Sequence, residues 1–276
     1  MARPKVELSN YETVYEFYEN HRQNMPFARV AHFMFARVFR CDVTADEGAA
    51  EAITEAIDSG TRLIISPNHI TGDDQYVIVA FAEKFKALRP LRGVTFIPAE
   101  PSLFTRSGRK GRLLRWAVDE AGALPTFRLE DLKRRKIEIT EEVTAAYRAA
   151  TLRASEIQVA KLDAGEMMAG FWEGTRNRTD YRIVQPLKKG MAHTAIAAAA
   201  TAPVAVLPVG IYYGAEPEDY ARPDVPGKRR PHIHIGTPLQ VDTDDAAVLA
   251  KRVHGEIQRC VDVVVARAER AAARVS

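Results

Sequence analysis

The amino-acid sequence predicts an α/β fold: a single domain with a largely parallel central sheet flanked by helices, preceded by an N-terminal helical extension. Short apolar runs of strand length alternate along the chain with longer helix-forming segments, the arrangement that produces parallel sheets. Several of these runs are followed by polar residues, as strands are at the working edge of such a sheet. The 276 residues are enough to bury one sizeable core. We therefore expect the extension over residues 1–45 and the α/β domain over residues 46–276.

Two helices are predicted within the N-terminal extension. The segment Ser9-Asn10-Tyr11-Glu12 is typical of a capping box and predicts a helix through about Arg22, and Pro26 suits the first turn of a second helix. On a helical wheel that runs to about residue 40, arginines share one side and apolar residues spread over the opposite arc: Arg22, Arg29, Arg37 and Arg40 against Phe27, Val30, Met34, Phe35, Val38 and Phe39. A helix at a membrane interface has such a pattern, and so does a helix docked on the core.

The predicted strands of the domain are short apolar runs that turn-forming or polar residues end. They cover residues 63–65, 91–98, 122–128, 167–172, 204–211 and 233–235. The predicted helices cover residues 50–58, 76–88, 129–164, 191–201 and 245–274, and the basic stretch 103–120 is partly helical. Because parallel strands end at one edge of a sheet, we expect the residues after these ends to gather there.

The composition argues against several classes of protein. The formal net charge of +3 is too small to predict nucleic-acid binding, although it suits an anionic substrate or a membrane surface. Cys41 and Cys260 lie far apart without ligand spacing, which argues against a disulfide framework or a thiolate metal site. The first residues lack the apolar core of a signal peptide, and no segment has transmembrane character. The sequence thus predicts a protein of the reducing cytoplasm.

The turn after the strand at 63–65 carries the best candidate for chemistry. His69 lies just past the strand end, and Asp74 falls in the first turn of the following helix, with Thr71 as its predicted cap. Imidazole is largely neutral near cellular pH, with an unperturbed pKa near ~6.5, and a nearby carboxylate fixes its tautomer. The pattern predicts His69 as a general base that Asp74 orients. Alternatively, Thr71 and Asp74 form a capping box and His69 is only a turn residue.

Charged and turn-forming residues follow three other strand ends. Arg128 ends the strand at 122–128, Glu173 and Arg176 follow the strand at 167–172, and a turn lies around Pro208. Two arginines suit an anion, and a backbone N–H near Gly174 suits developing negative charge. Together with the histidine base, these groups describe acyl transfer to a phosphate-bearing alcohol.

The order and the residues of these segments resemble the motifs of the glycerolipid acyltransferase family typified by 1-acyl-sn-glycerol-3-phosphate acyltransferase, over about residues 62–236. Asn68-His69 with Asp74 resembles the family's motif of a histidine, four residues and an aspartate. Residues 122–128 resemble its second block, which implies phosphate binding by Arg128. Residues 171–176 and 207–210 resemble its third and fourth blocks, which implies substrate binding by Glu173, Gly174, Thr175, Arg176 and Pro208. Three residues depart from the pattern: Trp172 replaces the usual proline, Asn177 a common serine, and Phe127 a frequent acidic residue.

The resemblance implies transfer of a fatty acyl group from acyl-CoA or acyl carrier protein to a lysophosphatidate-type acceptor in phospholipid biosynthesis. The thioester is then a co-substrate, and no cofactor or metal is expected. A covalent acyl-enzyme is not required, and the chain lacks a Gly-x-Ser-x-Gly elbow. The implied partners are the thioester donor, the phosphate-bearing glycerolipid and the cytoplasmic face of a membrane, to which the protein binds peripherally, and not a nucleic acid.

Three other functions remain open from the sequence. The acceptor can be glycerol 3-phosphate or another lysolipid, because both need the same base and anion clamp. The chain can also be a non-catalytic lipid-binding module that keeps the fold. Finally, His232 and His234 share one face of a strand and could join His69 and Asp74 in a hydrolytic metal site.

Overall fold

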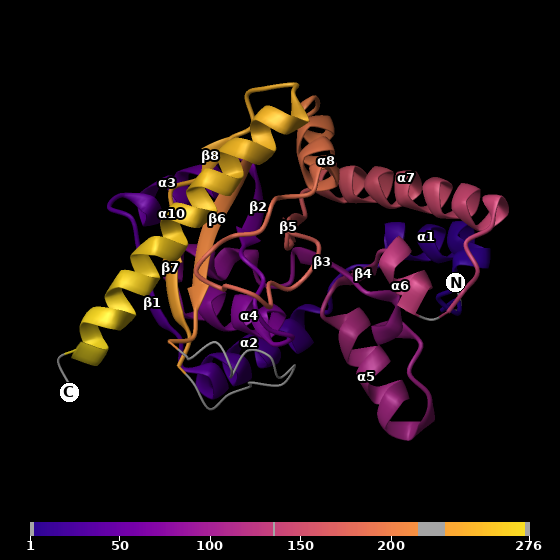
Figure 1. Ribbon diagram of the computed structural model, residues 1–276, viewed down its shortest axis with the longest axis horizontal. Helices are drawn as coiled ribbons and strands as arrows, with labels where there is room; N and C mark the ends of the chain where they lie inside the picture. Colours follow the sequence, from indigo (N-terminus) through magenta and orange to yellow (C-terminus); the bar gives the residue numbers. More distant parts are fainter. Residues whose placement is uncertain (1–2, 135, 215–229, 274–276) are drawn as a thin grey trace. The chain divides into compact units, whose positions relative to one another are not determined.

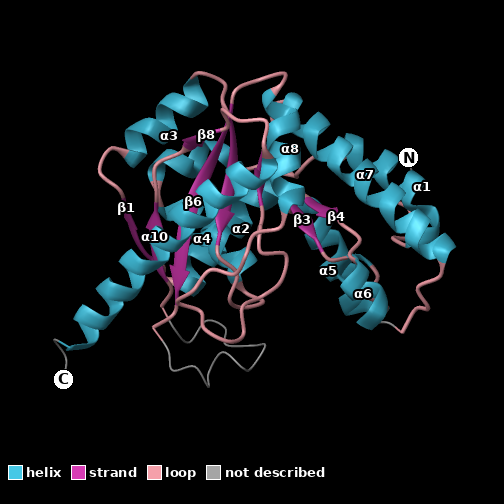
Figure 2. Ribbon diagram, turned by 45° about the horizontal axis from the view of Figure 1, so that its top comes forward, coloured by secondary structure: helices cyan, strands magenta, loops and turns pink. Residues whose placement is uncertain are grey.

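The computed structural model describes residues 3–134, 136–214 and 230–273. Within this part of the chain, helices alternate with short strands, and most strand pairs are parallel (Figure 2). The predicted α/β class, with a mostly parallel sheet, flanking helices and helices at the N-terminus, is therefore confirmed. The chain packs as two compact units: a first unit of Met1–Ala28 and Gly93–Met168, and a second unit of Arg29–Arg92 and Ala169–Ser276. The predicted boundary between residues 45 and 46 stays a prediction.

The first unit combines N-terminal helices with a three-strand parallel arrangement. Its elements are η1 (Leu8–Asn10), α1 (Tyr11–Asn20), the first turn of α2 (Met25–Phe39), β3 (Thr95–Ala99), η3 (Pro101–Phe104), α5 (Gly108–Glu120), β4 (Ala123–Pro125), α6 (Leu129–Arg134), α7 (Glu141–Asp163) and β5 (Met167–Ala169). Strand β3 pairs in parallel with both β4 and β5. Buried Asp119 accepts hydrogen bonds from Tyr18 and Arg3, which ties α1 and the N-terminal segment to α5.

The second unit contains the long central strands. Its elements are the rest of α2, β1 (Asp42–Ala45), α3 (Ala49–Asp58), β2 (Arg62–Pro67), α4 (Asp74–Lys84), η2 (Lys86–Leu91), α8 (Lys189–Ala199), β6 (Val204–Tyr212), β7 (His232–Ile235), β8 (Leu239–Gln240) and α10 (Ala246–Ala273). The strand order is β1-β7-β6-β2, with β2 parallel to β6 and β1 parallel to β7. Strands β7 and β8 pair with β6 in the antiparallel direction.

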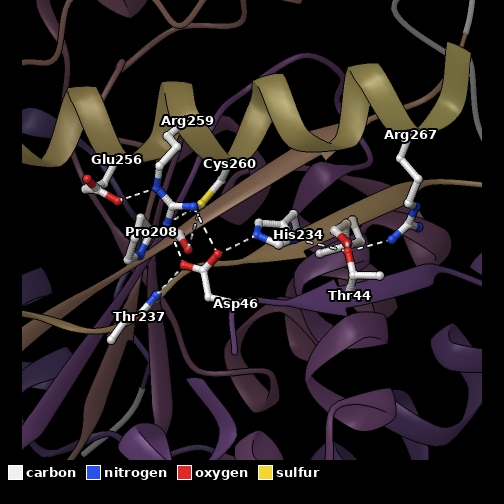
Figure 3. A network of polar contacts seen from close by, with 10 residues as sticks. Thr44, Asp46, Pro208, His234, Thr237, Glu256, Arg259, Cys260 and Arg267 are labelled. Atoms are coloured by element: carbon white, nitrogen blue, oxygen red, sulfur yellow. Dashed lines mark hydrogen bonds and ion pairs between the residues drawn. The ribbon is translucent and has the colours of Figure 1, made fainter. Parts of the chain in front are cut away.

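Helix α10 packs directly on β6 (Figure 1). A Cβ atom added to Gly210 would lie 2.4 Å from the carbonyl carbon of Cys260, so only glycine allows the helix backbone to pass this close. Polar side chains also hold α10 to β1 and to Asp46 directly after it, and Asp46 in turn contacts His234 of β7 (Figure 3). Arg259 donates to Asp46 at 2.9 Å, the His234 ring contacts the same carboxylate at 2.9 Å, and Arg267 pairs with Asp42.

The main differences between prediction and structure concern one helix, one strand and a further strand that was not predicted. The helix expected over 129–164 is two helices, because Lys136 takes a left-handed φ of 57° and the Thr140 hydroxyl caps α7 by accepting the Val143 N–H at 3.2 Å. The strand expected over 91–98 begins only at Thr95, since η2 and a turn at Gly93, with φ 81°, precede it. Strand β1 was not predicted, because its four residues Asp-Val-Thr-Ala have no apolar run and are defined by pairing with β7.

No helix in the described ranges combines the length and the apolar character needed to cross a lipid bilayer.

Candidate active site

Strand β2 delivers the first candidate residues to its carboxyl end. The strand is buried from Leu63 to Pro67 and lies beside β6, with Ser66 opposite Pro208. Directly after it, the Asn68 side chain donates to the Ile211 carbonyl at 3.0 Å and accepts the Ile211 N–H at 2.7 Å. This reciprocal pair fixes the residue before His69 to the end of β6.

His69 and Asp74 form a hydrogen-bonded pair across the turn that leads into α4. The Nδ1 atom of His69 lies 2.9 Å from Oδ2 of Asp74. Because a carboxylate oxygen accepts, Nδ1 carries the proton, which leaves the Nε2 lone pair available. Nε2 makes no hydrogen bond within the described residues, and the side chain remains 19% exposed. The prediction that imidazole and carboxylate meet at this turn is therefore confirmed.

The Asp74 carboxylate is completely buried and held from several directions. Oδ2 also accepts the backbone N–H groups of Ile70 and Thr71, at 2.5 and 2.8 Å. Oδ1 accepts the Thr71 hydroxyl at 2.8 Å and the Tyr213 hydroxyl at 2.6 Å. Burial and the adjacent carboxylate raise the pKa of Tyr213 above its usual range, so its hydroxyl remains a donor. These donors leave the carboxylate one orientation, toward the imidazole.

The structure shows part of the capping alternative that the sequence left open for this turn. Asp74 satisfies backbone N–H groups at the start of α4, as that alternative requires, but Asp73 occupies the N-cap position and makes no side-chain cap bond. Thr71 accepts the Asp73 N–H at 3.2 Å and donates to Asp74. The same carboxylate thus organises the turn and orients His69.

Glu173 holds the backbone beneath the imidazole. Its Oε1 accepts the His69 N–H at 2.6 Å, and its Oε2 accepts the Gln185 N–H at 2.9 Å. Burial raises the pKa of Glu173 to about 7, against the lowering effect of those two N–H groups. With both oxygens engaged and the side chain buried, the geometry gives Glu173 a positioning role, and its predicted contact with the acceptor stays a prediction.

The Gly174 N–H is already used within the third block. It donates to the Phe171 carbonyl at 3.1 Å and closes a turn in which Gly174 has φ 72°. The Gly174 N–H itself is therefore engaged, whereas the expectation of oxyanion donors near Gly174 and that of substrate binding by Gly174 stay predictions. The N–H groups of Thr175 and Arg176, which follow the turn, donate to no group among the described residues. They are the better candidates for oxyanion donors.

Arg176 lies in a loop that is attached to His69. The next residue, Asn177, donates its N–H to the His69 carbonyl at 2.8 Å. The Asn177 side chain then closes the loop: its Oδ1 accepts the Thr179 N–H at 3.0 Å, and its Nδ2 donates to the Ile183 carbonyl at 2.6 Å. The half-buried Arg176 guanidinium has no acidic partner within the described ranges, and Thr175 is exposed. An anion can therefore bind Arg176 without displacing an existing ion pair.

Two other predicted site residues have different surroundings. Arg128 belongs to the first unit, where it pairs with Asp131 at 2.9 Å and with Glu100 at 3.6 Å, so its phosphate contact stays a prediction. Pro208 is buried within β6, and its carbonyl accepts the Gly236 N–H at 2.9 Å. This placement gives Pro208 a packing role, and substrate contact by Pro208 also stays a prediction.

Three contacts of the site were not predicted from the sequence. The Phe171 ring stacks on the His69 imidazole, with centroids 3.9 Å apart and planes at 14°. Tyr213 binds Asp74, and the Asn177 side chain organises the third block. Trp172, the departure at the usual proline, is fully buried and fills the core.

The histidines of β7 do not join His69. The His232 ring contacts Asp42 at 3.2 Å. The His234 ring contacts Asp46 and the Thr44 hydroxyl (Figure 3). Among the residues that the structure describes, no three histidine, cysteine or acidic side chains converge to hold a metal ion. The predicted alternative of a metal site at His69, Asp74, His232 and His234 is therefore wrong for this arrangement, because each β7 histidine is already paired with a carboxylate from β1 or the loop after it.

Comparison with known proteins agrees with this geometry. The family model described as Acyltransferase matches residues 50–212, more than half of the chain, and that span contains all four predicted blocks. No curated protein matches the chain. Three findings agree with one another: the histidine and aspartate after the carboxyl end of β2, the bond between the third block and the histidine backbone, and the match to the family model. The chain therefore belongs to the acyltransferase family, the family of the glycerolipid acyltransferases.

Proposed function

We propose that the protein transfers a fatty acyl group from an acyl thioester, either acyl-CoA or acyl-ACP, to the hydroxyl of a lysophosphatidate-type acceptor. The proposal extends the family's general acyltransferase activity to a specific reaction in phospholipid biosynthesis. The observation that carries it is the His69 and Asp74 pair, in which a buried carboxylate fixes Nδ1 and Nε2 has no hydrogen-bond partner among the described residues. This is the state that a general base requires.

The chemistry needs one proton transfer and one acyl exchange. Nε2 of His69 takes the proton of the acceptor hydroxyl, and the resulting oxygen nucleophile attacks the thioester carbonyl carbon. The tetrahedral oxyanion then collapses, the C–S bond breaks, and the leaving thiolate takes up the proton from the imidazolium. The N–H groups of Thr175 and Arg176 stabilise the oxyanion in this scheme. Asp74 stabilises the imidazolium between the two steps.

The acceptor phosphate is the expected partner of Arg176. Its guanidinium has no acidic partner in the described chain, and its loop is bonded to the His69 carbonyl through Asn177. We propose that a charge-assisted bond holds the phosphate at Arg176, on the loop that is bonded to the His69 backbone, and that an attached glycerol hydroxyl then reaches the imidazole without a covalent step. Arg128 is proposed as a second phosphate ligand, which would require it to exchange its contacts with Asp131 and Glu100. We place the reaction at the cytoplasmic face of a membrane, where the protein binds peripherally.

The experiment that tests the proposal measures thiol release by the purified protein with lysophosphatidate and glycerol 3-phosphate side by side, each with acyl-CoA and with acyl-ACP, the acylated acyl carrier protein. Preference for lysophosphatidate supports the proposal. Preference for glycerol 3-phosphate, or for a lysolipid with another head group, assigns a different acceptor to the same base. Absence of thiol release across all donors and acceptors would favour the non-catalytic lipid-binding module.

A further inference from the structure

Helix α2 has an apolar side that is exposed to solvent. Val30, Phe33, Met34 and Val38 are 58%, 51%, 57% and 55% exposed. They make up four of the ten large hydrophobic side chains that are exposed in the described chain. At about 100° per residue, these positions lie along one side of the helix. We call this set of four residues the α2 face.

The opposite side of α2 holds the helix to the second unit. His32 and Phe39 are buried there. Phe35 stacks on Tyr76 of α4 with ring centroids 5.0 Å apart, and Phe39 lies 6.5 Å from the same ring. The α2 face is therefore not needed to dock the helix. Tyr76 follows Asp74 by two residues, so α2 is attached to the turn of α4 that carries the catalytic carboxylate.

The charges of α2 have one sign. The helix contains no acidic residue, and its Arg29 and Arg37 are exposed, as is Arg40 directly after its end. By helical geometry Arg37 lies within the α2 face and Arg29 lies beside it, which corrects the expectation that arginines and apolar residues occupy opposite sides. Arg40 follows the last helical residue and has a left-handed φ of 45°. The Arg37 guanidinium carbon lies 3.9 Å from the centroid of the Phe33 ring. None of the three arginines forms an ion pair within the described residues, so all three are available to external anions.

We propose that the α2 face binds an anionic lipid surface, with its four apolar side chains among the acyl chains and its arginines at the phosphate head groups. Exposed apolar residues bordered by unpaired arginines are the composition of a helix that lies in a membrane interface. A second copy of the chain fits this face less well, because a symmetric contact would bring the arginines of both copies together. The inference rests on the proposed function, since it names the surface that supplies the lipid acceptor to His69.

The test measures cosedimentation of the full chain with vesicles of equal parts phosphatidylcholine and phosphatidylglycerol, and with vesicles of phosphatidylcholine alone. The wild type should prefer the anionic vesicles. The double variant Phe33→Ser/Met34→Ser should bind them at least about tenfold more weakly, because two large apolar side chains no longer leave water. The variant Arg29→Gln/Arg37→Gln should lose roughly fivefold in affinity for each arginine, and only on anionic vesicles.

A matched control removes exposed apolar side chains from other helices. Leu152 on α7 and Val248 on α10 are 64% and 45% exposed, and Leu152→Ser/Val248→Ser should bind vesicles as the wild type does. Equal losses in the control and in the α2 variant would overturn the inference, because binding would then depend on surface hydrophobicity alone. Unchanged binding by the Phe33→Ser/Met34→Ser variant would also overturn it. The inference would also be overturned if the wild type does not bind vesicles but forms a dimer that the Phe33→Ser/Met34→Ser substitution dissociates.

Acyl transfer to a short-chain lysophosphatidate dispersed as monomers separates this inference from the proposed function. The Phe33→Ser/Met34→Ser variant should turn over the dispersed acceptor as the wild type does, and lose activity only on vesicle-bound acceptor. Retained turnover of the variant on vesicles at wild-type efficiency would contradict the docking role. If vesicle binding follows the predicted pattern but no thiol is released with any acceptor, the proposed function fails and α2 docking stands.

Discussion

Replacing Tyr213 by phenylalanine tests whether Asp74 is held rigidly for its partner His69. The substitution removes one hydroxyl and keeps the buried ring, so it creates no large cavity. It deletes the 2.6 Å bond from the hydroxyl to Oδ1 of Asp74 and the 3.2 Å contact with the Thr71 hydroxyl. A hydrogen bond to a charged group contributes about 1.5–3 kcal/mol, so we expect the free energy of unfolding to fall by about that amount.

The same substitution should also reduce turnover. Oδ1 keeps the Thr71 hydroxyl, and Oδ2 keeps its backbone donors, so the carboxylate loses only part of its support. A small displacement of a group that orients the base can cost up to about 10²-fold in rate, and we expect a decrease within that range. Thiol release and urea unfolding would measure the two effects on one preparation.

The matched control is Tyr212→Phe. Tyr212 is the last residue of β6 and precedes Tyr213, and its hydroxyl is not among the donors to Asp74. This control should keep wild-type turnover. A Tyr213→Phe protein with wild-type stability and turnover would show that the hydroxyl does not hold the carboxylate. Equal loss of turnover in both variants would assign the effect to strand packing instead.

Three further predictions concern other parts of the second unit. Burial raises the pKa of Glu173 from 4.5 to about 7, so the folded state binds more protons between those values and wild-type stability should fall with rising pH there, by about 3 kcal/mol relative to Glu173→Gln. Parallel pH curves from urea unfolding would contradict this. Arg176→Ala should raise the acceptor KM at least about tenfold, because a charge-assisted bond to phosphate is lost. Arg182→Ala should leave the acceptor KM unchanged, since Arg182 already pairs with Asp180. Equal acceptor KM values in the two variants would argue against a phosphate at Arg176. Gly210→Ala should destabilise the protein by about 1–3 kcal/mol or more, because its Cβ would lie 2.4 Å from the Cys260 carbonyl carbon; an unchanged urea midpoint would refute that close packing.

Local spacing was enough to predict the His69 and Asp74 pair. A histidine after a buried strand and an aspartate in the first turn of the next helix lie within reach of each other through the backbone alone. Tyr213 could not be predicted in the same way, because it lies 139 residues from Asp74 in the sequence and reaches it only through the pairing of β2 with β6.

Sequence patterns also predict the third block and the strands only in part. The sequence indicates a Glu-Gly-Thr-Arg turn, but only the folded structure shows that Glu173 accepts the backbone N–H of His69 and that the Gly174 N–H closes the turn. Strand β6 was predicted because residues 204–211 form a nearly continuous apolar run, and in the structure all nine of its residues are buried. Strand β1 was missed because polar Asp42 and Thr44 alternate with small apolar residues, and a partner strand is needed to define it.

The central claim is that the imidazole of His69 removes the acceptor proton, and thiol release by His69→Ala tests it most directly. His193→Ala is the matched control, because this histidine is exposed on α8. With lysophosphatidate and acyl-CoA, we expect His69→Ala to keep the fold and lose roughly 10²–10⁴-fold in turnover, while His193→Ala retains wild-type turnover. Near-normal turnover by a folded His69→Ala protein would remove His69 from the mechanism.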